Sequence, residues 1–310
     1  MLFDSFMIKF LTFLFIFNSA AYAQNHSVDL THPFYLLESG LFTLDLKGGL
    51  FMEEFEYEKA KVVQDLFEYK HEFYKLGTIV GLPQNRQFGI EFSFNANGDL
   101  DKKYAPALNL QRQDIPYKGF HAYDFFIQQH FEVENSKNKL AFELRTKGSP
   151  LKGKETNNTY SSKDFSFSLL YSHLHSDDWR LYGTVHTGII GKKKVYKYDG
   201  EIEVTSPYSL FGSLIGIQRL MGKFWLDLNG IFYLTTDYNS VSPSYTRLTD
   251  KGFIIGGKLT AGHYLTPNSI ITLTHQRQGA NFNVIAEDTS QETEFEIETQ
   301  ISQLGVTWLF

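Results

Sequence analysis

Cysteine is absent from this sequence of 310 residues, which excludes disulfides, thiolate metal ligands, cysteine nucleophiles and lipid-modified cysteines. An excess of basic charge is also missing. The 29 Lys and Arg stand against 35 Asp and Glu, and a net charge of −6 argues against nucleic acid as the main partner. After residue 24 no apolar run approaches the ~20 residues of a membrane-spanning helix, and no helical periodicity is sustained. What the chain does contain is 16% aromatic residues and a hydrophobic period of two.

Apolar and polar residues alternate over many short segments, which is typical of β-strands with two different faces. In residues 87–95 (QFGIEFSFN), Phe88, Ile90, Phe92 and Phe94 take one face and polar or small residues the other. Residues 140–145, 179–189 and 224–238 follow the same rule. A soluble sandwich would also alternate, but the aromatic crowding of the apolar face favours a lipid-facing band with aromatic girdles.

The connections between these segments alternate between short and long, as in outer-membrane barrels. Short turns are expected at 83–86, 135–138, 176–178, 221–223 and 266–268. Longer loops are expected near 59–65, 97–117, 148–163, 191–206, 240–250 and 285–292. The sequence therefore predicts an all-β, closed, antiparallel, up-and-down transmembrane β-barrel of about 12 strands, with both termini on the short-turn side.

The N-terminus has the pattern of a secretory signal peptide. An apolar core at 10–17 follows Lys9, and Ala21 and Ala23 form a small-residue cleavage site. We predict a signal peptide at 1–23, a periplasmic N-terminal segment at 24–40 and a barrel at 41–310. Residues 34–37 (FYLL) give the segment 24–40 apolar surface to bury, which favours a short plug over a loose tail.

The C-terminal strand carries the most specific motif. Gln303, Gly305, Trp308 and the terminal Phe310 resemble the assembly signal of bacterial outer-membrane barrels. This resemblance implies the barrel-assembly machinery as a partner and the outer membrane of a Gram-negative bacterium as the location. Lysines in two neighbouring loops predict contact with lipopolysaccharide phosphates: Lys147, Lys152, Lys154, Lys163, Lys192, Lys193, Lys194 and Lys197.

Three segments do not fit a single facing. Phe295, Ile297 and Ile301 are out of phase with residues 304–310, which predicts either a bulge or a polar outward stretch. In residues 207–220, positions 211, 215 and 217 compete with 210 and 214 for the outer face. The segment 41–58 changes phase near residues 52–55.

Charged residues of both signs fall on the face expected to line the lumen. They predict either a network of paired charges supporting the wall, which we favour, or a constriction that selects solutes. His130 and Glu132 across from Glu143 and Arg145 could bind a metal, but an Arg–Glu pair beside a satisfied histidine is favoured, and we expect no metal or cofactor. The candidates are Asp45, Lys47, Glu91, Asp124, Gln128, His130, Glu132, Glu143, Arg145, Arg180, His186, Asp227, Asn229, Asp237 and Lys258.

An outer-membrane lipid hydrolase is the main alternative, because barrels of this size include phospholipases and lipid A deacylases. The strings closest to a His-x-Ser arrangement are His173-Leu174-His175-Ser176 and His186-Thr187-Gly188, and neither places both groups at the outer leaflet. No catalytic residue is assigned from the sequence. A closed structural or surface-recognition barrel is the second alternative.

Residues 140–238 resemble one family. The strings LAFELRTKGSPLKG, KDFSFSLLYSH and DDWRLYGTVHTGIIGKK are similar to successive strands and loops of the outer-membrane transporters linked to meta-pathway phenol degradation. The usual Pro-Thr-Gly is replaced here by residues 149–153 (SPLKG). The resemblance implies passage of small molecules, hydrophobic ones among them, and transfers no catalytic residues. The expected function is passive movement of a small solute through a narrow, charge-lined lumen.

Overall fold

The computed structural model describes residues 30, 32, 34–59, 62–104, 113–115, 119–131, 137–148, 163–196, 202–243, 245–286 and 291–310. The predicted signal peptide at 1–23 and Glu132 lie outside these residues. No helix long and apolar enough to cross a membrane occurs within the described ranges.

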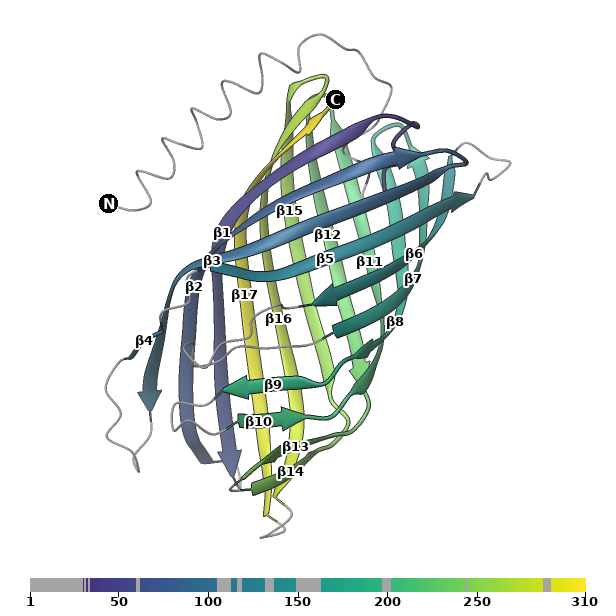
Figure 1. Cartoon of the computed structure of the whole chain (residues 1–310). Helices are drawn as coiled ribbons and strands as arrows, with labels where there is room; N and C mark the ends of the chain where they lie inside the picture. The colour runs from purple at the N-terminus through teal and green to yellow at the C-terminus, as the bar shows by residue number, and fades with distance from the viewer. Residues whose placement is uncertain are drawn as a thin grey trace.

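In the described part of the chain, twelve long strands form the wall of a closed barrel (Figure 1). Each is antiparallel to its neighbours, and β17 pairs with β1 to close the wall. The predicted fold class and strand number are therefore confirmed. The strands are β1 (Phe42–Lys59), β2 (Val62–Leu82), β3 (Arg86–Tyr104), β5 (Gly119–Phe131), β6 (Asn138–Gly148), β7 (Lys163–Ser176), β8 (Trp179–Ile190), β11 (Tyr208–Met221), β12 (Phe224–Thr235), β15 (Phe253–Thr266), β16 (Ser269–Ala286) and β17 (Gln291–Leu309).

Closure matters because an unpaired strand edge would leave backbone donors and acceptors without partners in lipid. The seam between β1 and β17 is hydrogen-bonded to its end. Phe42 N donates to Phe310 O at 3.1 Å, and Phe310 N donates to Phe42 O at 2.9 Å. The two phenyl rings stack with centroids 5.1 Å apart.

The connections differ in length on the two rims, and three of the long ones, between β3 and β5, β8 and β11, and β12 and β15, contain short strands. Short strands in these connections are β4 (Gln113–Ile115), β9 (Lys193–Tyr196), β10 (Ile202–Thr205), β13 (Tyr238–Ser242) and β14 (Tyr245–Thr249). The expected loop near 59–65 is shorter than predicted, because β1 runs to Lys59 and β2 resumes at Val62. On the short-turn rim, Gln84 and Asn85 take positive φ angles of 63° and 57° in the tight turn between β2 and β3.

Side chains alternate between an apolar outer face and a polar inner face. The pairing places Phe211, Ile215 and Ile217 of β11 outside, with Ile215 72% exposed, and leaves Leu210 and Leu214 inside. This resolves the ambiguity of residues 207–220. The predicted phase change near 52–55 is one of hydrophobicity and not of the backbone: Leu44 and Leu46 lie on the outer face, Glu54 and Glu56 follow on the same face, and β1 pairs with β17 in one register from Thr43 to Glu58.

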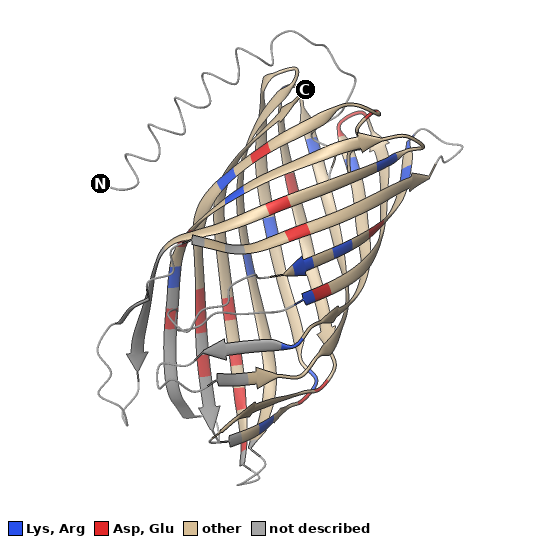
Figure 2. Cartoon of the chain, viewed as in Figure 1, with Lys and Arg blue, Asp and Glu red and all other residues tan. Residues whose placement is uncertain are grey.

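The far half of β17 is a polar outward stretch and contains no bulge. Its register with β1 and β16 continues without a shift, so Phe295 and Ile297 lie inside and Glu296 and Glu298 outside. Figure 2 shows acidic residues gathered along the lower parts of β1 and β17, away from the C-terminal rim. The hydrophobic phase inverts because the outer face passes from an apolar to an aqueous surrounding while the strand itself continues.

Aromatic rings lie flat on the inner wall over glycines of the neighbouring strand. A Cβ atom at Gly216 would lie 2.2 Å from the ring of Tyr182, and one at Gly89 would lie 2.2 Å from the ring of Phe126. Glycine at these positions lets a large side chain lie across the strand instead of projecting into the lumen. The narrow barrel thereby keeps bulky residues without filling its axis.

Candidate solute path in the lumen

The first cluster of inner charges joins three strands. Lys47 of β1 and Lys75 of β2 each place Nζ 2.8 Å from a different carboxylate oxygen of Glu91 on β3. Contact between β1 and β3 requires a side chain to reach across β2, which the small residue Gly77 permits. Such convergence occurs on the concave side of a barrel, so these residues line the interior.

The second cluster is centred on Arg145 of β6. Its guanidinium contacts Glu143 at 2.7 Å and Asp124 of β5 at 3.0 Å, and it lies 4.8 Å from the ring centroid of Phe126. Gln128 Nε2 donates to Glu143 at 2.6 Å. The predicted Arg145–Glu143 pair is therefore present, and both carboxylates bind the same cation.

His130 belongs to the edge of this cluster. It is buried, and its Nε2 lies 3.4 Å from the amide oxygen of Gln128. No group of three potential metal ligands was found among the residues that the structure describes.

The facing wall, formed by β8, β11, β12 and β15, holds a buried hydrogen-bonded network. Tyr182 donates to the carboxylate of Asp227 at 2.6 Å, and Asn229 Nδ2 donates to Asp227 at 3.0 Å. Arg180 donates to Gln218 at 2.5 Å, both buried, and Lys258 pairs with Asn229 in the register of β12 and β15. The sequence placed Arg180, Asp227, Asn229 and Lys258 on this inner face, and the structure does the same.

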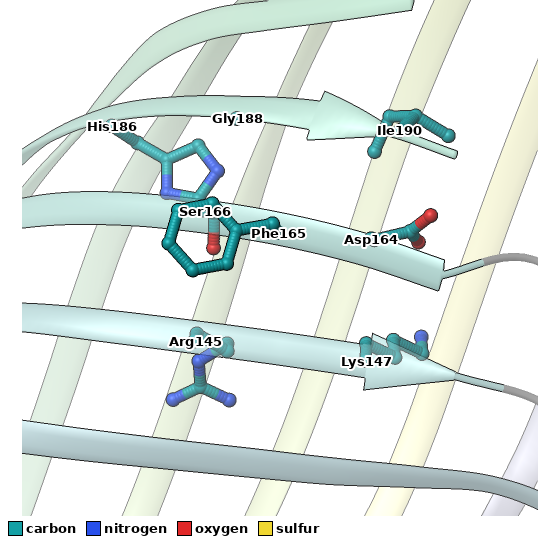
Figure 3. Close-up of a pocket in the computed structure, with 8 residues that line it drawn as sticks. All are labelled: Arg145, Lys147, Asp164, Phe165, Ser166, His186, Gly188 and Ile190. Carbon is teal, nitrogen blue, oxygen red and sulfur yellow. The ribbon is translucent and has the colours of Figure 1, made fainter. Parts of the chain in front are cut away.

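Toward the long-loop rim, the inner face of β6, β7 and β8 encloses a small cavity of about 110 Å³. Figure 3 shows its lining, with Arg145 and Lys147 on β6 and His186 on β8. His186 Nδ1 lies 2.9 Å from the hydroxyl of Ser168, and Asp164 accepts a hydrogen bond from Gly191 N at 3.0 Å. This part of the wall offers cations, an imidazole and a carboxylate within one recess.

The segment before β1 contacts the inner wall at widely separated strands. His32 Nε2 lies 2.9 Å from Ser172 Oγ on β7, and the ring of Phe34 packs edge-on against Tyr182 on β8. Leu37 N donates to the side-chain oxygen of Gln87 on β3 at 3.0 Å. Strands β7 and β8 are neighbours, but β5 and β6 separate them from β3, so the segment spans the inner wall between these two places.

Apolar burial fixes the same segment on its remaining side. Leu30 and Leu37 are buried with Ile270 of β16 and Leu309 of β17. Burial, with the carboxylate of Asp45 nearby, raises the pKa of Tyr35 well above its usual value, so the phenol stays protonated. The carbonyl of Tyr35 accepts a hydrogen bond from Gln87 Nε2 at 2.9 Å.

The structure brings most of the sequence candidates to the inner wall, with two exceptions. Asp237 is exposed in the connection between β12 and β13, and Glu132 lies outside the described residues. Asp45 lies on the inner face, where Thr307 donates to it at 2.5 Å. The same face of β17 carries Gln303 and Gly305 of the C-terminal motif, while Val306 and Trp308 cluster with Leu44, Leu46, Ile271, Leu304 and Phe310 on the other face.

Three participants were missed from the sequence. Gln87 and Gln218 lie on faces that the alternation marks as polar, so parity could have identified them. Lys75 lies in a segment of mixed polarity (YKHEFYKLG) that gives no clear face. Its role depends on its neighbour Glu91, which only the pairing of β2 with β3 reveals.

No family model matches the chain, and no curated protein does. Among solved structures, it is similar to the COG4313 outer-membrane channel from Pseudomonas putida F1, at 9% identity and a TM-score of 0.54, over 91% of this chain and 100% of that one. It is also similar to the transport unit of the autotransporter AIDA-I from Escherichia coli, at 9% identity and a TM-score of 0.49, over 94% and 95% of the two chains. The toluene transporter TodX from Pseudomonas putida matches at 6% identity and a TM-score of 0.42, over 86% and 89%.

At 9% identity, the likeness to the COG4313 channel is one of fold alone. The chain has the fold of an outer-membrane β-barrel, and the predicted likeness to this class is confirmed at that level.

Proposed function

We propose that this protein is an outer-membrane channel for passive movement of a small solute through a narrow, charge-lined lumen. The observation that carries the proposal is the inner wall, where ion pairs connect β1, β2 and β3 and connect β5 with β6. Charged side chains are costly to bury in an apolar medium. A barrel interior that carries many of them is therefore polar or contains water. The fold shared with the COG4313 outer-membrane channel supports the proposal.

The lumen carries no excess of either sign, which favours weakly charged, neutral or zwitterionic solutes over a single class of ion. On the twelve wall strands, counting only side chains that the structure describes, alternation and pairing place seven acidic and seven basic residues on the inner face. The acidic ones are Asp45, Glu53, Glu91, Asp124, Glu143, Asp164 and Asp227. The basic ones are Lys47, Lys75, Lys139, Arg145, Lys147, Arg180 and Lys258.

We further propose that residues 24–40 act as a plug at the short-turn rim. The contacts of His32 and Phe34 with the neighbouring strands β7 and β8, and of Leu37 with β3, support this. The segment makes no strand pairing with the wall in the described residues before Leu41, and its side-chain hydrogen bonds and apolar contacts can be removed while the strand pairs of the barrel stay in place. The plug would set the channel closed at rest.

Single-channel conductance of the mature chain in a planar bilayer tests both statements. We expect rare, small openings for residues 24–310 and a steady conductance after deletion of 24–40. Phe34→Ala, which removes the ring contacts with Tyr182 and His32, should lie between the two. Folding of each protein is checked by heat-modifiable migration in SDS gels.

The outcomes separate the two proposals. Equal, steady conductance with and without residues 24–40 would exclude the plug while supporting the channel. A folded barrel that stays silent after the deletion would exclude the channel.

A further inference from the structure

One hydrogen-bonded pair on the outer face joins two strands and is invisible in the linear sequence. His275 of β16 and Ser302 of β17 are directly opposed, and Nδ1 of the imidazole lies 2.9 Å from Oγ. Both side chains are exposed. With the proton of the neutral ring on Nε2, its preferred position, Nδ1 accepts the hydroxyl proton. A hydroxyl within hydrogen-bond reach of an imidazole acceptor is the core of a nucleophile–base pair.

Exposed leucines surround this pair on three sides. Leu50 lies opposite Ser302 on β1, Leu259 lies opposite His275 on β15, and Leu273 precedes His275 by two residues on the same face. Their side chains are 42%, 50% and 60% exposed. The pair therefore lies at the edge of the apolar outer band.

On the remaining side the outer face becomes charged. Arg277 and Gln300 are the next opposed residues, and both donate to Glu298, at 2.6 Å and 2.7 Å. Arg277 is well exposed and keeps further N–H groups for a ligand. Farther from the leucines, on β17, lie Glu296 and Glu294, which are both exposed. Asn281 of β16 donates a hydrogen bond to each of them.

The order of these groups along the strands matches the order of groups in one class of lipid. Leu273, the Ser302–His275 pair and Arg277 follow one another at intervals of two residues, or about 6.8 Å, and Glu296 lies a further four residues along the strand, beyond Glu298. A glycerophospholipid with an ammonium headgroup presents acyl chains, an ester, a phosphate and a cation in the same sequence. The glutamates would repel an anionic headgroup.

We propose that Ser302 and His275 form a hydrolytic site on the outer face that cleaves an acyl ester of such a phospholipid. Ser302 Oγ attacks the carbonyl carbon while His275 takes its proton, and the ester C–O bond breaks as that proton passes to the leaving alcohol. Water then attacks the acyl-serine, gives one proton to His275, and releases the fatty acid as Ser302 recovers its hydrogen. The site is independent of the lumen and of the channel proposed above.

Two other Ser–His contacts show what is particular about this one. Ser168–His186 has the same distance and the same ring nitrogen, but it faces the lumen. His32 belongs to the N-terminal segment, and its contact with Ser172 of β7 is buried inside the barrel. Only the pair on β16 and β17, among these three, is placed where a membrane lipid can reach it.

The test uses the purified, folded mature chain with mixed micelles of detergent and phosphatidylethanolamine. Free fatty acid and lysophospholipid are quantified by mass spectrometry. Ser302→Ala and His275→Gln should each lower the rate by about 10²-fold or more, because nucleophile and base act as one unit. Thr187→Ala is the matched control, since Thr187 is an exposed hydroxyl on the outer face of β8.

A fluorophosphonate probe gives an independent readout that a structural role would not produce. We expect covalent labelling of Ser302, located by peptide mass spectrometry and lost in His275→Gln. Phosphatidylglycerol should be cleaved more slowly than phosphatidylethanolamine. Hydrolysis that persists in folded Ser302→Ala, or a folded wild-type protein with neither hydrolysis nor labelling, would overturn the proposal, and equal cleavage of both lipids would overturn its headgroup assignment.

Discussion

The phenol ring of Tyr182 occupies the space that a side chain at position 216 would fill. A Cβ atom there would lie 2.2 Å from the ring, so Gly216→Ala must push Tyr182 away from its hydrogen bond with Asp227. We expect a loss of about 1–3 kcal/mol in the free energy of unfolding, the usual cost of overpacking. Urea unfolding in detergent micelles, followed by tryptophan fluorescence, measures it.

Gly230→Ala is the control for that variant. Gly230 lies on the outer face of β12, and a Cβ there would meet no atom within 4 Å. Its urea midpoint should stay close to that of the wild type. Identical midpoints for the two variants would show that the ring of Tyr182 moves without cost.

Adjacent residues of β6 test the assignment of inner and outer faces. Phe142 lies on the outer face, where its ring centroid is 6.1 Å from that of Phe167 and 5.8 Å from that of Phe131. Phe142→Arg should impair insertion, at a cost of about 2–4 kcal/mol if the site lies near the bilayer midplane. Glu143→Gln, one residue on and facing inward, should insert normally. The folded fraction in lipid vesicles is the readout, and reversed phenotypes would mean that the facing is wrong.

At the scale of the strand, the terminal residue holds the seam of the barrel. Phe310 exchanges two backbone hydrogen bonds with Phe42 and stacks on its ring. Deleting Phe310 removes all three contacts and the aromatic end of the predicted assembly signal. We expect less assembled barrel in the outer membrane, scored by heat-modifiable migration, and near-normal assembly for Phe310→Tyr. Normal assembly of the deletion would exclude a role for the terminal ring.

Strand existence was predictable because the outer face needs apolar residues at every second position. Residues 87–95 and 224–235 alternate cleanly, and both are strand with the predicted facing. Alternation did not predict the facing where the surroundings of the outer face change along one strand. Phe295 and Ile297 left open a bulge or a polar outward stretch, and the continuous register of β17 shows the second, because hydrophobicity reports the medium outside the wall and not the backbone. Residues 207–220 stayed undecided for another reason, because Leu210 and Leu214 place apolar side chains on the inner face as well.

At the scale of the whole molecule, the balance of charge in the lumen predicts weak ion selectivity. In the Phe34→Ala background, a KCl gradient should give a reversal potential near zero. Glu143→Gln should shift it toward anions and Arg145→Gln toward cations, because each removes one sign from the same ion pair. Shifts of the same sign in both variants, or none, would show that this pair does not border the ion path.

The individual charged residues of the lumen were predictable, but their partners were not. The alternation of faces placed Lys47 and Glu91 inside. Their contact joins residues far apart in the sequence and depends on the curvature of β1, β2 and β3. Likewise, His275 and Ser302 carry no motif along the chain, and only the register of β16 with β17 opposes them. Sequence patterns report local faces, whereas a site on a barrel is assembled between strands.

Rings laid over glycines have a consequence for the evolutionary record. Tyr182 and Gly216 share one volume, as do Phe126 and Gly89, so neither member can change freely. Homologous barrels should show paired substitutions at these positions, with a side chain at 216 or 89 arising only where the opposing ring has become small. Such covariation, sought between positions 182 and 216, would read the packing of the lumen from sequences alone.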